Sequence, residues 1–495
     1  MTALRAEVLV VGSGAGGAAT AWTLAEAGLD VVLLEEGARH APEDYGAPPS
    51  VAFGRLYRNR GMTPILGRVP IGYVEGRCLG GSTEINSGFW HRAPRETLQR
   101  WEATYGLEHA TEDALRPHYE WAESALGVGL HAGPWPRSTE LFAKGIARMG
   151  WSYQEVPRAA PGCRGTNRCA QGCPTGAKQG MTRRLLPEAE ARGVRVVTGM
   201  RVLQVLIEGD RAVGVVGHLS RPGRPRELVR LDADHVFVCA GPTESPALLL
   251  KSGIKHHVGN SLRVHPYLKV AARFDEDVGA TGTVLPLLQV KEFAPELSLG
   301  GAFFNPGQLA MTLGDGDGDA SAVHRDAARS ALYYAGVRGS GRGWVRPALL
   351  GEDATEIRYE LSGADAARLR TGLARLAEIL IASGAREVRA AVHGLPPIRA
   401  ERDAVSLLDA DVAADRMSLV TVHAFSSCPA GTDRARCAVD SFGRVYGTRN
   451  LLVNDASILP DSPGVNPQGT VMALARRNAL AFVEARRKPA DPQPG

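Results

Sequence analysis

The stretch "EVLVVGSGAGGAATAWTLAEAGLDVVLLEEGA", residues 7–38, decides the fold. The apolar run at residues 8–11 predicts a buried parallel strand, and a second such run follows at residues 31–34. Between them, residues 18–27 read as a helix that ends at Gly28. Strand, glycine turn, helix and strand in this order are typical of the βαβ unit that binds a dinucleotide.

The glycines of this turn have separate predicted tasks. Gly12 permits the tight turn, Gly14 lets the backbone approach a pyrophosphate, and Gly17 lets the helix pack on the strand. The helix N-terminus then faces the phosphates, and Glu35 can accept hydrogen bonds from a ribose. The expected contacts of the turn are Gly12, Gly14, Ala15, Gly16 and Gly17. The unit alone leaves NAD(P) and FAD equally open.

Composition narrows the class of protein. The chain has 495 residues, 44% hydrophobic and 22% charged, which is typical of a globular protein with more than one lobe. The net charge of +4 is spread thinly, so no nucleic-acid partner is expected. No apolar run is long enough for a membrane span, and the first residues lack the features of a signal peptide, so we expect a cytoplasmic protein.

The rest of the chain alternates between two kinds of segment. A second glycine turn, "GRCLGGSTEINSGFWHRAP", occupies residues 76–94, and residues 95–150 read mainly as helix. The strand "ADHVFVCAG" leads into the turn and helix of "GPTESPALLLKSGI". Residues 266–420 look like a separate layer of strands with one strong helix, on which Leu369, Leu373, Leu376 and Leu380 share a core face.

Four ordered blocks together resemble the glucose–methanol–choline (GMC) oxidoreductase family. They are the βαβ unit, the second glycine turn from Gly76 to Asn86, the segment "GPTESPALLLKSGI", and His423 followed by "NLLVNDAS" and "NPQGTVMALA". The third block departs from the family pattern at Lys255, where glycine is usual. The resemblance implies an α/β fold in which an FAD-binding, Rossmann-like, doubly wound domain carries an inserted α+β substrate domain with an antiparallel sheet.

The same resemblance divides the chain into domains. It assigns residues 1–94, 191–265 and 421–487 to the FAD-binding domain. Residues 95–190 and 266–420 form the substrate-binding domain and its covering loops, and residues 488–495 are expected to be a disordered tail.

FAD is the expected cofactor because two remote parts of the chain can hold opposite ends of one long ligand. Leu451–Val453 reads as a strand that ends at Asp455, and Asn466 with Pro467 is expected to cap and begin the last helix. Ile85 stands where some relatives link FAD through a histidine, so binding is expected to be non-covalent. The other expected FAD contacts are Glu35, Arg77, Gly80, Gly81, Ser82, Asn86, Gly88, Val202, Asp455, Ala456, Asn466, Pro467 and Thr470.

The resemblance also implies oxidation of an alcohol to an aldehyde or ketone. His423 matches the family's catalytic histidine and is the expected base for the hydroxyl proton, while the hydride passes to flavin N5. Asn466 matches the second catalytic position and is expected to hold the substrate oxygen. His265 is a weaker candidate for the base. Two alternatives stay open: a flavin-containing lyase or photo-decarboxylase without net redox turnover, and a nicotinamide dehydrogenase.

Three cysteines form a compact cluster. The spacing Cys163-x5-Cys169-x3-Cys173 resembles that of bacterial GMC dehydrogenase subunits with a [3Fe–4S] cluster, and also a cysteine-containing loop of long-chain alcohol oxidases. The first interpretation implies a protein electron carrier as acceptor. The second, which we favour, leaves O₂ or a quinone.

Overall fold

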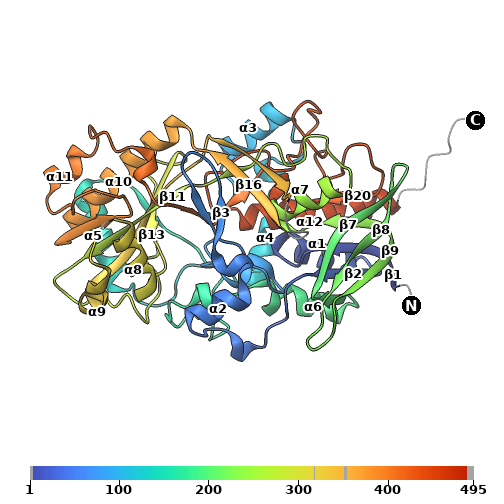
Figure 1. Ribbon diagram of the computed structural model, residues 1–495, viewed down its shortest axis with the longest axis horizontal. Coiled ribbons are helices and arrows are strands. Elements are labelled where there is room, and N and C mark those ends of the chain that lie inside the picture. The colour runs from blue at the N-terminus through green and yellow to red at the C-terminus, as the bar shows by residue number, and fades with distance from the viewer. Residues whose placement is uncertain (1–3, 317, 350–353, 488–495) are drawn as a thin grey trace, which may run out of the picture.

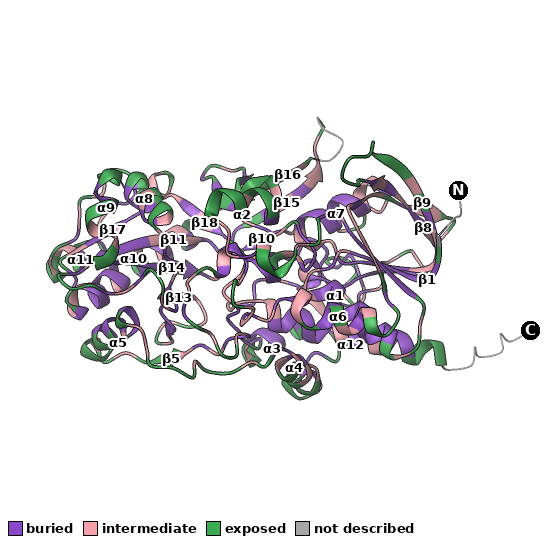
Figure 2. Cartoon of the chain, turned by 90° about the horizontal axis from the view of Figure 1, so that it is seen from below, coloured by how far each residue is buried: buried purple, intermediate pink, exposed green. Residues whose placement is uncertain are grey.

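The computed structural model describes residues 4–316, 318–349 and 354–487, so the predicted tail at 488–495 lies outside the described residues. The structure is mixed α/β, with two large sheets toward opposite ends of an elongated molecule (Figure 1). The first and the last described elements, β1 (Leu4–Val11) and α12 (Gln468–Arg487), lie in the half that contains the first sheet. The buried residues of each sheet and its helices form cores of their own, and buried segments run through both ends of the molecule (Figure 2).

The first sheet contains the predicted βαβ unit. β1 pairs in parallel with β2, with Val8 opposite Val31, and with β9 on its other side. The strands in spatial order are β6 (Arg195–Thr198), β2 (Val31–Glu35), β1 (Leu4–Val11), β9 (Glu227–Val238), β8 (Arg211–Leu219) and β7 (Met200–Glu208), with β20 (Leu451–Val453) also on β9. Its order and parallel core confirm the predicted Rossmann-like architecture.

Small residues explain how closely α1 (Ala15–Glu26) sits on this sheet. A Cβ at Gly16 would lie 2.1 Å from the Asn454 carbonyl oxygen, and one at Gly17 would lie 1.9 Å from the Gly12 carbonyl oxygen. Only a residue without a side chain fits at either position. The glycine turn therefore holds the helix N-terminus directly against the ends of β1 and β20.

The second sheet is the antiparallel layer that the sequence predicts. Its strands in spatial order are β3 (Thr63–Ile65), β4 (Ile71–Tyr73), β18 (Leu419–Thr421), β11 (Tyr267–Arg273), β14 (Ser330–Val337), β13 (Leu297–Gly301), β12 (Leu288–Val290) and β5 (Tyr153–Glu155), with β17 (Glu387–Ala390) also on β11. β18 and β4 are parallel, and the other pairs are antiparallel. Two small ribbons pair β10 (Arg263–Val264) with β19 (Ala424–Phe425), and β15 (Arg342–Pro347) with β16 (Thr355–Glu360).

Helices cover both sheets. α10 packs on the second sheet and against α5, and its four predicted core leucines are fully buried. The helices are α1, α2 (Pro49–Leu56), α3 (Arg95–Tyr105), α4 (Glu112–Leu126), α5 (Arg137–Met149), α6 (Leu185–Ala191), α7 (Gly241–Lys251), α8 (Pro306–Asp315), α9 (Val323–Asp326), α10 (Gly363–Ser383), α11 (Glu401–Ser406) and α12 (Gln468–Arg487). Within the described ranges, none of them has both the length and the apolar character needed to cross a membrane.

One segment joins the sheets in a way that the sequence does not predict. β3 and β4 belong to residues 1–94, which the sequence assigns to the FAD-binding domain, yet they pair with β18 in the second sheet. Each has three residues, which is too short to show an alternating pattern. The segment between the two glycine turns therefore belongs to both layers.

Replacing Gly17 by Ala should destabilise the protein, because the new methyl group would overlap the Gly12 carbonyl oxygen at 1.9 Å. We expect a loss of about 1–3 kcal/mol or more in the free energy of unfolding, measured by urea denaturation of the apoprotein. Gly54→Ala is the matched control: Gly54 lies in α2 with nothing within 4 Å of its Cβ, so that change should be neutral or slightly stabilising. Equal stability of both variants would contradict the packing argument.

Candidate active site

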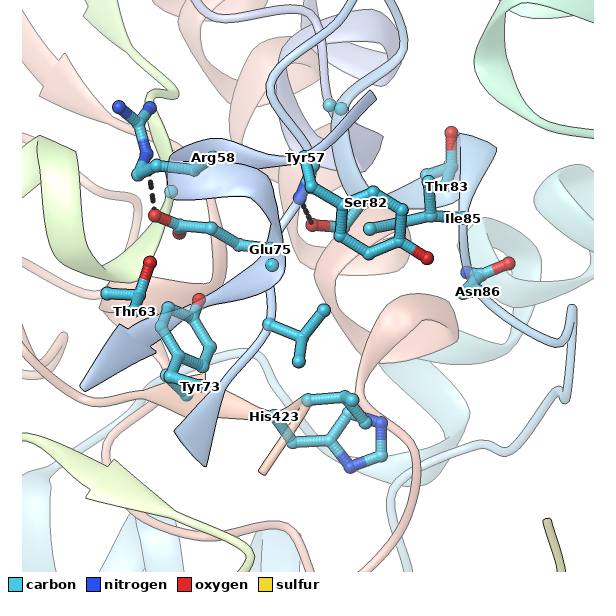
Figure 3. A pocket seen from close by; sticks show the side chains of 18 of the residues that line it. Tyr57, Arg58, Thr63, Tyr73, Glu75, Ser82, Thr83, Ile85, Asn86 and His423 are labelled. Carbon is cyan, nitrogen blue, oxygen red and sulfur yellow. Dashed lines mark hydrogen bonds and ion pairs between the residues drawn. The ribbon is translucent and has the colours of Figure 1, made fainter. Parts of the chain in front are cut away.

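A cavity of about 1390 Å³ lies between the two sheets. Its wall includes the turn at Gly12 and Gly14 from the first sheet, Tyr267 from β11 of the second, and the pair His423 and Asn466. Figure 3 shows His423 on the opposite side of this pocket from the charged pair Arg58 and Glu75. The cavity is thus long enough to connect the glycine turn with the two predicted catalytic side chains.

The two glycine turns meet at one end of the cavity. A Cβ on Gly81 would lie 3.1 Å from the Cα of Gly14, and the backbone N–H of Gly80 donates to the Ser13 hydroxyl at 2.9 Å. Gly14 itself has nothing within 4 Å of its Cβ position, so its exposed side faces open space. This is the cradle that a pyrophosphate needs: backbone N–H groups at a helix N-terminus with no side chain in the way.

Glu35 braces the same turn. Its carboxylate accepts from the Ser13 backbone N–H at 3.1 Å, from the Ser13 hydroxyl at 2.5 Å and from the Gly37 N–H at 2.8 Å. Burial raises the pKa of Glu35 above its usual value, and these donors offset only part of that effect. Glu35 also lines the cavity, so it can face a ribose as predicted while it holds the turn.

A buried network of charges lines the cavity near Val202, and the sequence gives no signal of it. Arg58 Nε lies 2.6 Å from Glu75 Oε1, and Arg201 lies 2.8 Å from Glu244 Oε2. Both arginines also pair with Glu36. Burial raises the pKa of Glu36, but the two guanidinium groups outweigh it and bring the pKa to about 2. The cations of this network are therefore neutralised within the protein.

Asp455 joins three segments at the carboxyl ends of the strands. One carboxylate oxygen accepts from the Gly241 N–H at 2.9 Å and from the Ser245 hydroxyl at 2.5 Å, and the other accepts from the Ser457 N–H at 2.8 Å. Burial raises the pKa of Asp455 above its usual value, and these hydrogen bonds offset only part of that effect. The position next to α7 and β20 makes Asp455 part of the wall, as predicted.

His423 is held by polar side chains on both ring nitrogens. Its Nδ1 lies 2.9 Å from the Tyr267 hydroxyl and 3.2 Å from His265 Nδ1, and its Nε2 lies 3.4 Å from the Asn466 amide nitrogen. His265 Nε2 in turn lies 2.7 Å from the Ser462 hydroxyl. The ring is half-buried and faces the cavity, and burial lowers its pKa to about 4. His423 is therefore neutral at physiological pH.

The start of the last helix differs from the prediction. α12 begins at Gln468, and the Val471 N–H donates to the Pro467 carbonyl oxygen, so Pro467 rather than Asn466 occupies the N-cap position. Asn466 lies one residue before the cap, and its side-chain amide reaches His423 instead. Proline can take the cap because a cap position needs only a carbonyl oxygen for the first helical bond.

The structure brings most of the predicted site residues to this one cavity. Those that line it are Gly12, Gly14, Ala15, Gly16, Glu35, Gly81, Ser82, Asn86, Gly88, Val202, His423, Asp455, Ala456, Asn466 and Pro467. Four other predicted residues are not part of the cavity wall but contact neighbouring residues. Gly17 packs on Gly12, Gly80 donates to Ser13, Arg77 pairs with Glu36, and the Thr470 hydroxyl lies 3.0 Å from that of Tyr119.

The three clustered cysteines line a second, small pocket with Arg158 and Lys178. The Arg158 guanidinium lies 3.7 Å from Cys163 Sγ and 3.5 Å from Cys169 Sγ, so a cation occupies the space between these thiols. Among the described residues, no three His, Cys, Asp or Glu side chains are placed to hold a metal ion. The thiols as arranged do not fit an iron–sulfur cluster.

The fold and the cavity define a class of protein: a dinucleotide-binding oxidoreductase whose cavity wall carries a histidine. Residues 9–267 match the N-terminal domain of the GMC oxidoreductase family, and residues 346–475 match its C-terminal domain. The chain belongs to this family and is an FAD-dependent oxidoreductase. The cradle at Gly14 and the length of the cavity fit FAD.

Relatives and solved structures agree with this assignment. The chain is 40% identical to an uncharacterised GMC-type oxidoreductase of Sinorhizobium fredii, over 97% of this chain and 94% of the relative. It is 26% identical to a long-chain-alcohol oxidase of Arabidopsis thaliana, over 98% of this chain and 68% of that one. The fold resembles pyridoxine 4-oxidase from Mesorbium loti, with a TM-score of 0.73 and 19% identity over 96% of this chain and 99% of that one.

Gly14→Val should abolish FAD binding without unfolding the protein. Open space surrounds the Cβ position and the backbone is extended there, so we expect the protein to tolerate the side chain, which would fill the cradle. We expect the apoprotein to keep its urea midpoint while FAD titration, followed by flavin fluorescence, shows at least a tenfold weaker affinity. Retention of wild-type FAD affinity would show that the phosphates bind elsewhere.

Proposed function

We propose that the protein oxidises an alcohol to an aldehyde or ketone, with His423 Nε2 as the base for the hydroxyl proton. The observation that carries the proposal is the pair of His423 and Asn466, 3.4 Å apart on the wall of a cavity that continues to the glycine turn. Bound FAD would supply the hydride acceptor. Asn466 would orient the substrate oxygen against His423 through its amide N–H.

The hydrogen-bond network supports Nε2 as the atom that accepts the proton. The Asn466 amide nitrogen is a donor, so the Nε2 it faces carries a lone pair. The ring hydrogen then resides on Nδ1, where it can be donated to His265 Nδ1. His265 has its own hydrogen on Nε2, directed at the Ser462 hydroxyl. This chain holds His423 in the tautomer that a general base requires.

The cavity wall beyond His423 supports an alcohol with an apolar body. Phe303, Met311 and Tyr334 of the second-sheet region line this part. We assign O₂ or a quinone as the electron acceptor rather than a protein carrier. A protein carrier would go with an iron–sulfur cluster at the three cysteines, and the Arg158 guanidinium lies between two of these thiols instead. The name of the Arabidopsis thaliana relative, a long-chain-alcohol oxidase, agrees with this assignment.

Replacing His423 by Ala should slow flavin reduction by roughly 10²–10⁴-fold, the usual contribution of a positioned general base. The experiment mixes FAD-loaded protein with an alcohol panel anaerobically and follows bleaching of the flavin absorbance. Asn466→Ala should cause a smaller loss, since it removes orientation and leaves the base. Controls are the FAD content and melting temperature of each variant.

Two results would overturn the proposal. One is unimpaired reduction by His423→Ala. The other is a wild-type flavin that stays oxidised with every alcohol, as a lyase or photo-decarboxylase would.

The pH profile should show an acid limb well below the ordinary range of histidine. Burial lowers the pKa of His423 to about 4, so the neutral base persists above that pH and is lost as pH falls through it. We therefore expect kcat/KM for the alcohol to be level near neutrality and to decline only toward pH 4. An acid limb near 6.5 would show that His423 is solvated or that another group is the base.

A further inference from the structure

Lys269 places an ammonium group on the wall of the substrate part of the cavity. It lies on β11, two residues after Tyr267, and side chains two apart on a strand point to the same side. The intervening Leu268 and the next residue Val270 are fully buried in the core. Tyr267 and Lys269 therefore both face the cavity, and Tyr334, opposite Lys269 on β14, lines it too.

This ammonium differs from the other cations around the active site. Lys178 donates to the carbonyl oxygens of Asn86 and Cys169, at 3.1 and 3.2 Å. Within the part of the chain that the structure describes, Lys269 has no side-chain hydrogen-bond or ion-pair partner. Burial lowers its pKa, and the charge of Asp315 at the end of α8 raises it. Asp315 accepts a hydrogen bond from Ser418 at 2.8 Å.

A half-buried ammonium that makes no ion pair is costly, because burial removes part of its hydration and the more distant charge of Asp315 offsets only part of that loss. An anion on a ligand would restore that balance. A single lysine balances one negative charge, so a monoanion such as a carboxylate suits it better than a phosphate dianion, whose second charge would stay uncompensated in the cavity.

The position of Lys269 relative to the base sets the size of such a ligand. The Tyr267 hydroxyl lies 2.9 Å from His423 Nδ1, and the Cα atoms of Tyr267 and Lys269 are about 7 Å apart at the usual rise of a strand. A hydroxyl at His423 and a carboxylate at Lys269 would thus be several bonds apart. The apolar side chains of Phe303 and Met311 would contact the methylene groups between them.

From this geometry we infer that Lys269 is a carboxylate-binding subsite and that the substrate is a hydroxy acid, with its alcohol and its carboxylate separated by a short apolar chain. The alcohol end of this inference rests on the proposed function. The carboxylate end rests on Lys269 alone and can be measured without any oxidation.

The test compares 6-hydroxyhexanoate with 1-hexanol on the FAD-loaded protein. We expect wild-type kcat/KM to favour the hydroxy acid by about tenfold or more, the usual effect of a hydrogen bond to a charged group. Lys269→Met should bring the ratio close to one, mainly through KM, and Lys269→Arg should keep part of the preference. Lys255→Met, which removes an exposed lysine, is the matched control and should keep the wild-type ratio. His423→Ala should lower turnover of both compounds together.

Binding of hexanoate, which carries no alcohol, separates this inference from the proposed function. Calorimetric titration of the FAD-loaded protein should show binding that weakens about tenfold in Lys269→Met and is retained in Lys255→Met. Lysine-dependent hexanoate binding without turnover of either alcohol would leave the subsite in place and refute the proposed oxidation. Turnover of both alcohols at equal kcat/KM, or hexanoate binding that is equal in wild type and Lys269→Met, would overturn the subsite.

Discussion

The close contact between two glycine turns is the constraint on which the rest of the structure depends. Gly14 and Gly81 approach backbone to backbone, and the Ser13 hydroxyl joins them by donating to Glu35 and accepting from Gly80. A side chain on Gly81 would press on the Gly14 backbone, because its Cβ would lie 3.1 Å from the Gly14 Cα. Because the second turn follows directly on strands of the second sheet, this contact also sets how far His423 lies from the cradle at Gly14.

Local patterns in the sequence predict those parts of the fold that local physics determines. The βαβ unit is visible because its strands are fully buried and its glycines have no substitute. The core face of α10 is visible because four leucines repeat at helical spacing. The pair His423 and Asn466 is predicted through a resemblance in the segments around them, and the structure places the two side chains together.

The features that the sequence does not predict all depend on contacts between distant segments. Arg58 meets Glu244, almost two hundred positions away, and no spacing rule connects them. Tyr267 and His265 reach His423 because β11 pairs with β18 and β10 pairs with β19, the two strands on either side of His423. The start of α12 differs by one residue because the cap depends on which carbonyl oxygen is free, and sequence alone does not distinguish Asn466 from Pro467.

The two halves of the cavity differ in whether their charged side chains have partners within the protein. Around the glycine turn, Arg58 and Arg201 already have carboxylate partners, so their charges stabilise the wall and are not free for a second anion. Around His423, the polar groups are neutral or make no ion pair: burial lowers the pKa of His423, and the charge of Lys269 is offset only in part by the more distant Asp315. Groups without internal partners gain the most from a ligand, because the ligand removes a cost that the folded protein already bears. On the proposals made above, cofactor binding would therefore depend on backbone shape, and substrate choice on electrostatics.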